Sequence, residues 1–96
     1  MTTAAGWTIF TNHGHVLLLI AREPELRLRD VAARVGITER SAQKIVRELE
    51  TAGYVVKEKV GRRNVYRVHA HQHLRHPLEA EHEIGELVDV FRPDPS

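Results

Sequence analysis

The chain reads DVAARVGITERSAQKIVRELETAG from Asp30 to Gly53, and this stretch decides the fold. Its first part has the apolar spacing of a short helix, which Gly36 can end in a left-handed conformation. Thr38 is a good N-cap for a second helix, which we predict over residues 38–52. The apolar positions of that helix follow the i, i+3, i+4, i+7 pattern and are Ala42, Ile45, Val46 and Leu49. Two helices joined by a tight glycine turn predict a helix-turn-helix motif.

A β-hairpin is predicted directly after this motif. Residues 54–60 and 65–69 are rich in β-branched and aromatic residues and flank the loop Gly61-Arg62-Arg63-Asn64. Gly61 and Asn64 can supply the positive φ angles that tight hairpin turns need. Such a hairpin, here residues 54–69, is the wing of a winged helix.

Further helices are predicted on both sides. Residues 11–22 predict a helix that Pro24 stops, and Leu26-Arg27-Leu28 is at most a short edge strand. An apolar stripe between Pro77 and Pro93 predicts a last helix, started by one proline and ended by the other. The fold class is therefore mainly α with a β-hairpin wing, a winged helix-turn-helix.

The length of 96 residues fits one small domain. The sequence divides it into an N-terminal extension with a possible dimer contact, the winged helix-turn-helix domain, a His-rich linker and a C-terminal helix for dimerisation. These segments are residues 1–10, 11–69, 70–76 and 77–92.

Composition excludes several classes of protein. The absence of cysteine excludes a disulfide scaffold, a thiolate metal site and a cysteine nucleophile. The longest apolar run, residues 16–21, is too short for a membrane-spanning helix, which needs about twenty residues. Residues 1–6 lack the pattern of a signal peptide, so we expect a cytoplasmic protein that contacts no membrane.

Charge is distributed unevenly along the chain. Residues 22–67 hold twelve Lys and Arg against seven Asp and Glu, whereas residues 68–96 hold two against six. The net charge of +1 therefore combines a basic middle with an acidic tail. This pattern predicts an anionic partner for the middle only.

A cationic face is predicted on the second helix of the motif. Arg40, Lys44 and Arg47 fall together opposite the apolar positions, as major-groove insertion requires. Polar residues that can donate to phosphates or bases flank this face, namely Thr38, Ser41 and Gln43. A solvated charged face is the alternative interpretation. The helix-turn-helix context and the basic hairpin favour contact with double-stranded DNA.

Arg62 and Arg63 are placed by the sequence at the hairpin tip, where a wing reaches a flanking minor groove or the DNA backbone. Charged loop tips are also common on hairpins that bind nothing.

Residues 26–69 resemble the winged helix-turn-helix domain of MarR-type transcriptional regulators. The matching text is LRLRDVAARVGI, then TERSAQKIVRELETAGYV, then the hairpin. The resemblance implies a bacterial, homodimeric transcription regulator, with repression as the family default. It also implies that the cationic helix face named above contacts DNA. It identifies no effector molecule.

Two other readings stay open, a winged helix that binds proteins and a metal-responsive repressor of the ArsR type. The second depends on a histidine cluster, His69, His71, His73 and His76, since imidazole is a common zinc ligand. We expect these histidines to form a polar linker without metal, and no cofactor is required. No catalytic motif is present, so we do not expect an enzyme.

Apolar residues outside the winged core predict a homodimer. They lie before the first helix and along the last one, and an exposed apolar surface often marks an interface. The residues expected at the dimer contact are Trp7, Phe10, Ile84, Leu87, Val88 and Phe91. Packing of both segments within one chain is the alternative.

Overall fold

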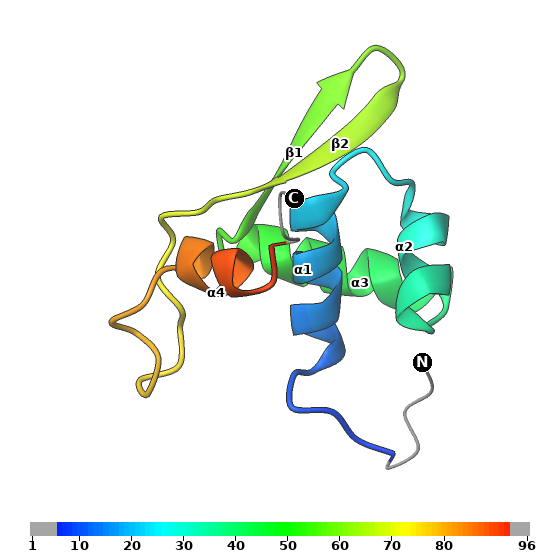
Figure 1. Cartoon of the computed structure of the whole chain (residues 1–96). Coiled ribbons are helices and arrows are strands. Elements are labelled where there is room, and N and C mark those ends of the chain that lie inside the picture. Colours follow the sequence, from blue (N-terminus) through cyan, green and yellow to red (C-terminus); the bar gives the residue numbers. More distant parts are fainter. Residues whose placement is uncertain (1–5, 93–96) are drawn as a thin grey trace.

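The computed structural model describes residues 6–92 of the chain. The first five residues of the N-terminal extension, and Pro93, which the sequence analysis expects to end the last helix, lie outside this part. The elements in chain order are α1 (Asn12–Arg22), α2 (Leu28–Val35), α3 (Glu39–Thr51), β1 (Val55–Val60), β2 (Arg63–Val68) and α4 (Ile84–Val90). The expected winged helix-turn-helix fold is confirmed: helices pack together and a two-stranded hairpin extends from them (Figure 1).

The helix-turn-helix forms where the local signals place it. Gly36 ends α2 in the left-handed conformation, with φ of 91°. Thr38 caps α3, because its Oγ1 accepts a hydrogen bond from the backbone N–H of Ser41 at 3.0 Å. The connection is therefore short, and α2 and α3 pack directly against each other.

The expected edge strand at residues 26–28 is wrong. Arg27 is the N-cap of α2, and its carbonyl accepts from the N–H groups of Asp30 and Val31. Both leucines pack against the core without forming a strand. Leu26 lies at the end of a turn, and Leu28 is the first residue of α2. A single backbone bond, from Tyr66 N–H to the Pro24 carbonyl at 3.4 Å, joins this connection to β2.

The wing is an antiparallel pair in which Val55 faces Val68 and Val60 faces Arg63. Its turn is shorter than the sequence indicates, because Arg63 and Asn64 already belong to β2. Gly61 has φ of 63°, and no residue other than glycine has positive φ in the described part of the chain. The positive φ expected at Asn64 is therefore wrong.

The last helix is much shorter than the expected range 77–92. Residues 77–82 form turns, with Glu79 N–H bonded to the His76 carbonyl and His82 N–H bonded to the Glu79 carbonyl. α4 begins after Glu83, where Glu83 and Glu86 form a capping box. Pro77 permits a helix start, but the segment after it has no apolar face to bury, since Leu78 is exposed.

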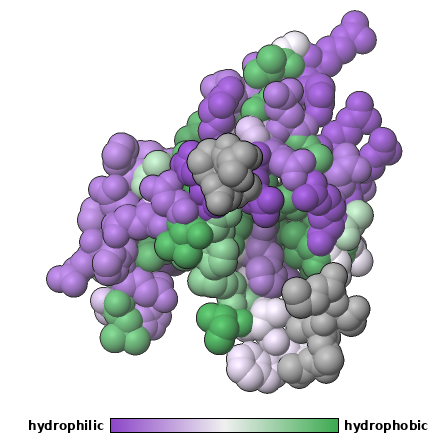
Figure 2. Space-filling view, viewed as in Figure 1, coloured by the Kyte–Doolittle hydropathy of each residue, from purple (hydrophilic) through white to green (hydrophobic). Residues whose placement is uncertain are grey.

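The core lies between α1, α3 and the base of the wing. Its fully buried side chains include Val16 of α1, Val31 of α2, Val46 of α3 and Ile84 of α4. The outer surface is largely hydrophilic on the side seen in Figure 2. Within residues 6–92, no helix combines the length and the apolar character needed to cross a bilayer.

Candidate nucleic-acid interface

The exposed face of α3 carries Arg40, Lys44 and Arg47. The opposite face is buried against α1 and α2 through Ala42, Ile45, Val46 and Leu49. Burial of one face fixes the rotation of the helix, so all three cations point into solvent as a group. The structure therefore presents the cationic face that the helical spacing predicts.

The flanking polar residues Thr38, Ser41 and Gln43 are also exposed. Two of them are engaged in the cap, because the Thr38 hydroxyl donates to Ser41 Oγ at 3.0 Å while it accepts from the Ser41 N–H. Gln43 makes no side-chain hydrogen bond within residues 6–92. Its amide can both donate and accept, which suits it to a base edge.

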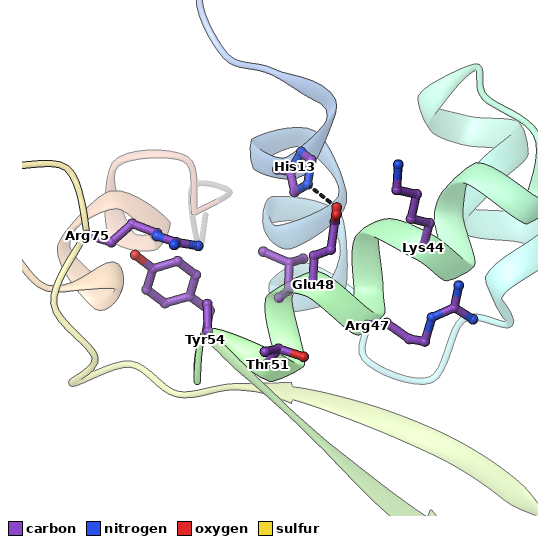
Figure 3. Close-up of a pocket in the computed structure, with 9 residues that line it drawn as sticks. His13, Lys44, Arg47, Glu48, Thr51, Tyr54 and Arg75 are labelled. Carbon is purple, nitrogen blue, oxygen red and sulfur yellow. Dashed lines mark hydrogen bonds and ion pairs between the residues drawn. The ribbon is translucent and has the colours of Figure 1, made fainter.

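Glu48 borders the cationic face and contacts a histidine of α1. Its Oε1 lies 2.8 Å from His13 Nε2 (Figure 3). The hydrogen bond from His13 lowers the pKa of Glu48, and the nearby charges of Lys44 and Arg47 lower it further. Sequence reasoning missed this role of His13, because the pair joins residues on separate helices.

A hollow lies along the C-terminal half of α3. Lys44, Arg47, Thr51 and Tyr54 line it together with Arg75, which comes from the loop after β2 (Figure 3). Arg75 is exposed and has no counterpart in the sequence prediction. The sequence signal that could have singled it out is a positive charge in an acidic tail, where Arg92 is the other arginine or lysine.

The wing is basic, but its two predicted arginines differ. Arg62 lies in the turn and is exposed. Arg63 lies in β2, and its guanidinium donates to the backbone carbonyl of Glu25, in the connection between α1 and α2. Arg67 pairs with Glu58 across the strands at 3.3 Å. All of these cations are exposed, but within residues 6–92 only Arg62, Lys57 and Lys59 of the wing have no carboxylate or carbonyl partner.

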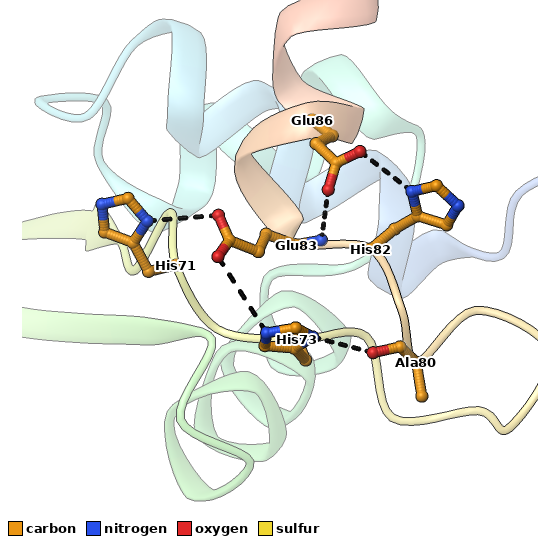
Figure 4. A network of polar contacts seen from close by, with 6 residues as sticks. All are labelled: His71, His73, Ala80, His82, Glu83 and Glu86. Atoms are coloured by element: carbon orange, nitrogen blue, oxygen red, sulfur yellow. Dashed lines mark hydrogen bonds and ion pairs between the residues drawn. The ribbon is translucent and has the colours of Figure 1, made fainter.

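One carboxylate, that of Glu83, contacts two residues of the histidine segment. His71 Nδ1 is 3.1 Å from Glu83 Oε1, and His73 Nε2 is 4.0 Å from Glu83 Oε2 (Figure 4). His73 Nδ1 also bonds the Ala80 carbonyl at 2.7 Å. No group of three or more potential ligands is arranged to hold a metal ion among residues 6–92.

The expected dimer contact needs one correction. Ile84 is only 1% exposed and belongs to the core of its own chain, so it is not available to a partner. Val88 also packs partly against that core. Phe10 and Phe91 meet edge to face within the chain, with ring centroids 5.6 Å apart. Trp7, Ile9 and Val90 remain exposed beside them in sequence.

A comparison with protein-family models identifies the family of the chain. A family model described as the MarR family matches residues 10–63, which is more than half of the chain. The matched residues include α1, α2, α3 and β1. No curated protein matches the chain.

Proposed function

The chain belongs to the MarR family of DNA-binding transcription regulators, and we propose that it recognises specific sequences in double-stranded DNA and represses transcription by occluding promoters. The observation that carries this proposal is the exposed group Arg40, Lys44 and Arg47 on α3. A protein-interaction module has no need for such a concentrated charge on its recognition helix.

In this proposal the N-terminal half of α3 enters the major groove. Arg40 is well placed to pair with a guanine through its planar fork, and Gln43 to pair with an adenine. Lys44 and Arg47 contact bases or phosphates further along the groove. The wing contacts the flanking minor groove or backbone through Arg62, with Arg63 set back towards the body of the domain.

We further propose that the protein acts as a homodimer in the bacterial cytoplasm. Two copies related by a two-fold axis would place their α3 helices about one DNA turn, ~34 Å, apart. The preferred site would then be nearly palindromic. The exposed apolar residues Trp7, Ile9, Val90 and Phe91 support a contact formed by the terminal segments.

Selection of bound duplexes from a random DNA pool tests this function. We expect a nearly palindromic preferred sequence. Its affinity should fall linearly with the logarithm of the salt concentration, by a slope of about 0.9 for each phosphate contact. Two results would contradict the proposal. One is a duplex affinity that does not change between low and physiological ionic strength, and the other is a selection that enriches no sequence.

A further inference from the structure

We propose that Arg75 contacts a phosphate of the same duplex that α3 reads, which makes residues 69–83 a second backbone clamp beside the wing. This inference rests on the proposed function. The proposed contact lies at the C-terminal end of α3. It is separate from the contact of the wing, which is formed by the hairpin of β1 and β2. The partner group is a DNA phosphate, and the contact is independent of sequence.

The position of Arg75 carries the first step. Its side chain lines the same hollow as Lys44, Arg47 and Thr51, so all four side chains border one open space on the surface. Figure 3 shows the Arg75 side chain extending from its loop towards Tyr54, which lies three residues after the end of α3. The hollow therefore brings a cation from a segment distant in sequence to the C-terminal end of α3, beyond Tyr54 and the pair of His13 with Glu48.

The segment that carries Arg75 is fixed to the domain on both sides. Gln72 Nε2 donates to the Ala52 carbonyl at the end of α3 at 3.2 Å, and the Gln72 carbonyl accepts from Ile84 N–H at 2.8 Å. Leu74 N–H bonds the His82 carbonyl at 3.0 Å, and its side chain packs against the core. A cation on such a support loses little backbone freedom when it binds an anion.

Local charges leave Arg75 available. Within residues 6–92, Arg34, Arg67 and Arg92 each pair with a carboxylate, and Arg75 takes part in no such pair. Glu48, the acid of the shared hollow, is engaged by His13. Glu79 lines an adjoining hollow with Arg75 and lies outside the one shared with α3.

Distance along the helix selects a phosphate over a base. From Arg40 to Thr51 the rise of an α-helix amounts to about 16 Å. The major groove is about 12 Å wide, and recognition helices read bases with their N-terminal residues. A cation at the far end of α3 therefore lies beyond the base edges, where the backbone passes. The guanidinium fork matches a phosphate in two-point geometry.

Salt-dependent binding of a fixed mixed-sequence duplex, and of the selected site, tests the inference. The variants are Arg75→Ala, Arg75→Lys and the control Arg92→Ala, which removes the same charge next to α4. We expect Arg75→Ala to weaken binding to both duplexes by the same factor and to make the salt slope shallower by about 0.9 for each bound protomer, about 1.8 for a dimer. Between roughly 50 and 200 mM salt, the affinity ratio of wild type to variant should then shrink about three- to fourfold for one bound protomer and about twelvefold for a dimer. Arg75→Lys should restore the slope.

Three results would overturn the inference. If wild type binds steeply with salt while Arg75→Ala matches Arg92→Ala, Arg75 makes no contact and the proposed function stands. If Arg75→Ala weakens binding without changing the slope and lysine does not restore it, the role of Arg75 is structural. If wild-type protein shows no salt-dependent duplex binding, this inference and the proposed function both fail.

Discussion

At the scale of single residues, Thr38 and Thr11 occupy the same place in different helices. Both are N-caps with extended backbone, but only Thr38 uses its side chain to accept a backbone N–H. We expect Thr38→Ala to lower the free energy of unfolding by about 1 kcal/mol, because a donor of the first turn loses its partner. Thr11→Ala should cost clearly less. Chemical denaturation of both variants measures the difference, and equal losses would contradict the capping role.

His82, which lies just before α4, forms a titrating pair with Glu86 in the first turn of that helix. The pKa of His82 is raised, first by its hydrogen bond with Glu86, and Glu81 contributes least. The pKa of Glu86 is lowered by the backbone N–H of Glu83 and by His82. The histidine contribution to stability is complete below its unfolded pKa of 6.5 and is lost as pH rises through the higher folded value. The glutamate contribution is present above 4.5 and is lost as pH falls through the lower folded value.

Glu86→Gln should therefore bring the pKa of His82 back towards 6.5. Glutamine keeps an oxygen that can accept the Glu83 N–H, so the start of α4 should persist. Glu81→Gln is the matched control and should move the pKa of His82 much less. A proton NMR titration of the His82 ring gives both values. An unchanged pKa in Glu86→Gln would exclude the pair in solution.

Arg40 and Arg62 should separate base reading from backbone contact. Arg40→Ala should weaken the selected site by about 1–3 kcal/mol and leave mixed-sequence DNA less affected, because a base contact carries the sequence information. Arg62→Ala should weaken binding to both duplexes alike and reduce the salt slope by about 1 for each bound protomer, about 2 for a dimer. Equilibrium titration of each variant against both duplexes provides the comparison. Equal loss on both duplexes for Arg40→Ala would remove it from base recognition.

At the scale of elements, sequence reasoning succeeded where signals were local. The N-cap residue and the apolar spacing predicted both ends of α3 to within one residue. The signals were local, since Thr38, the apolar stripe and Gly53 lie on the helix or next to it. Sequence reasoning failed at residues 26–28, where alternation indicated a strand that does not form. It also failed at residues 77–82, where a proline indicated a helix start but the chain forms turns. The true start of α4 has a local signature, Glu83 and Glu86, which the stronger signal of Pro77 obscured.

The candidate interface divides in the same way. The three cations of α3 could be predicted, because one helix sets their relative positions. The contact of His13 with Glu48 and the placement of Arg75 could not, since each depends on how distant segments pack. The hydrogen bond from Arg63 to the Glu25 carbonyl also depends on long-range packing, so the sequence could not predict it.

At the scale of the whole molecule, the proposed dimer would form through apolar residues that remain exposed outside the core. Val90 is 74% exposed at the end of α4 and Leu78 is 89% exposed on the loop before it. We expect Val90→Asp to shift the protein towards monomers and to weaken the palindromic site, because it buries a charge in an apolar contact. Sedimentation velocity measures the shift. Leu78→Asp is the control and should leave the assembly intact.

A wild-type monomer at tens of micromolar would contradict the dimer, whatever the variants do. The alternative, in which the terminal segments serve only their own chain, would then account for the contact of Phe10 with Phe91.

The burial of Ile84 also leads to an expectation about the order in which the domain forms. Its side chain shares one cluster with Val16, so the core joins residues from near both ends of the domain. Such long-range contacts slow folding, because a large loop must close before they are gained. We expect the three helices and the wing to collapse first and α4 to dock last. During synthesis, a chain that stops short of Ile84 would expose part of its apolar interior to chaperones and proteases.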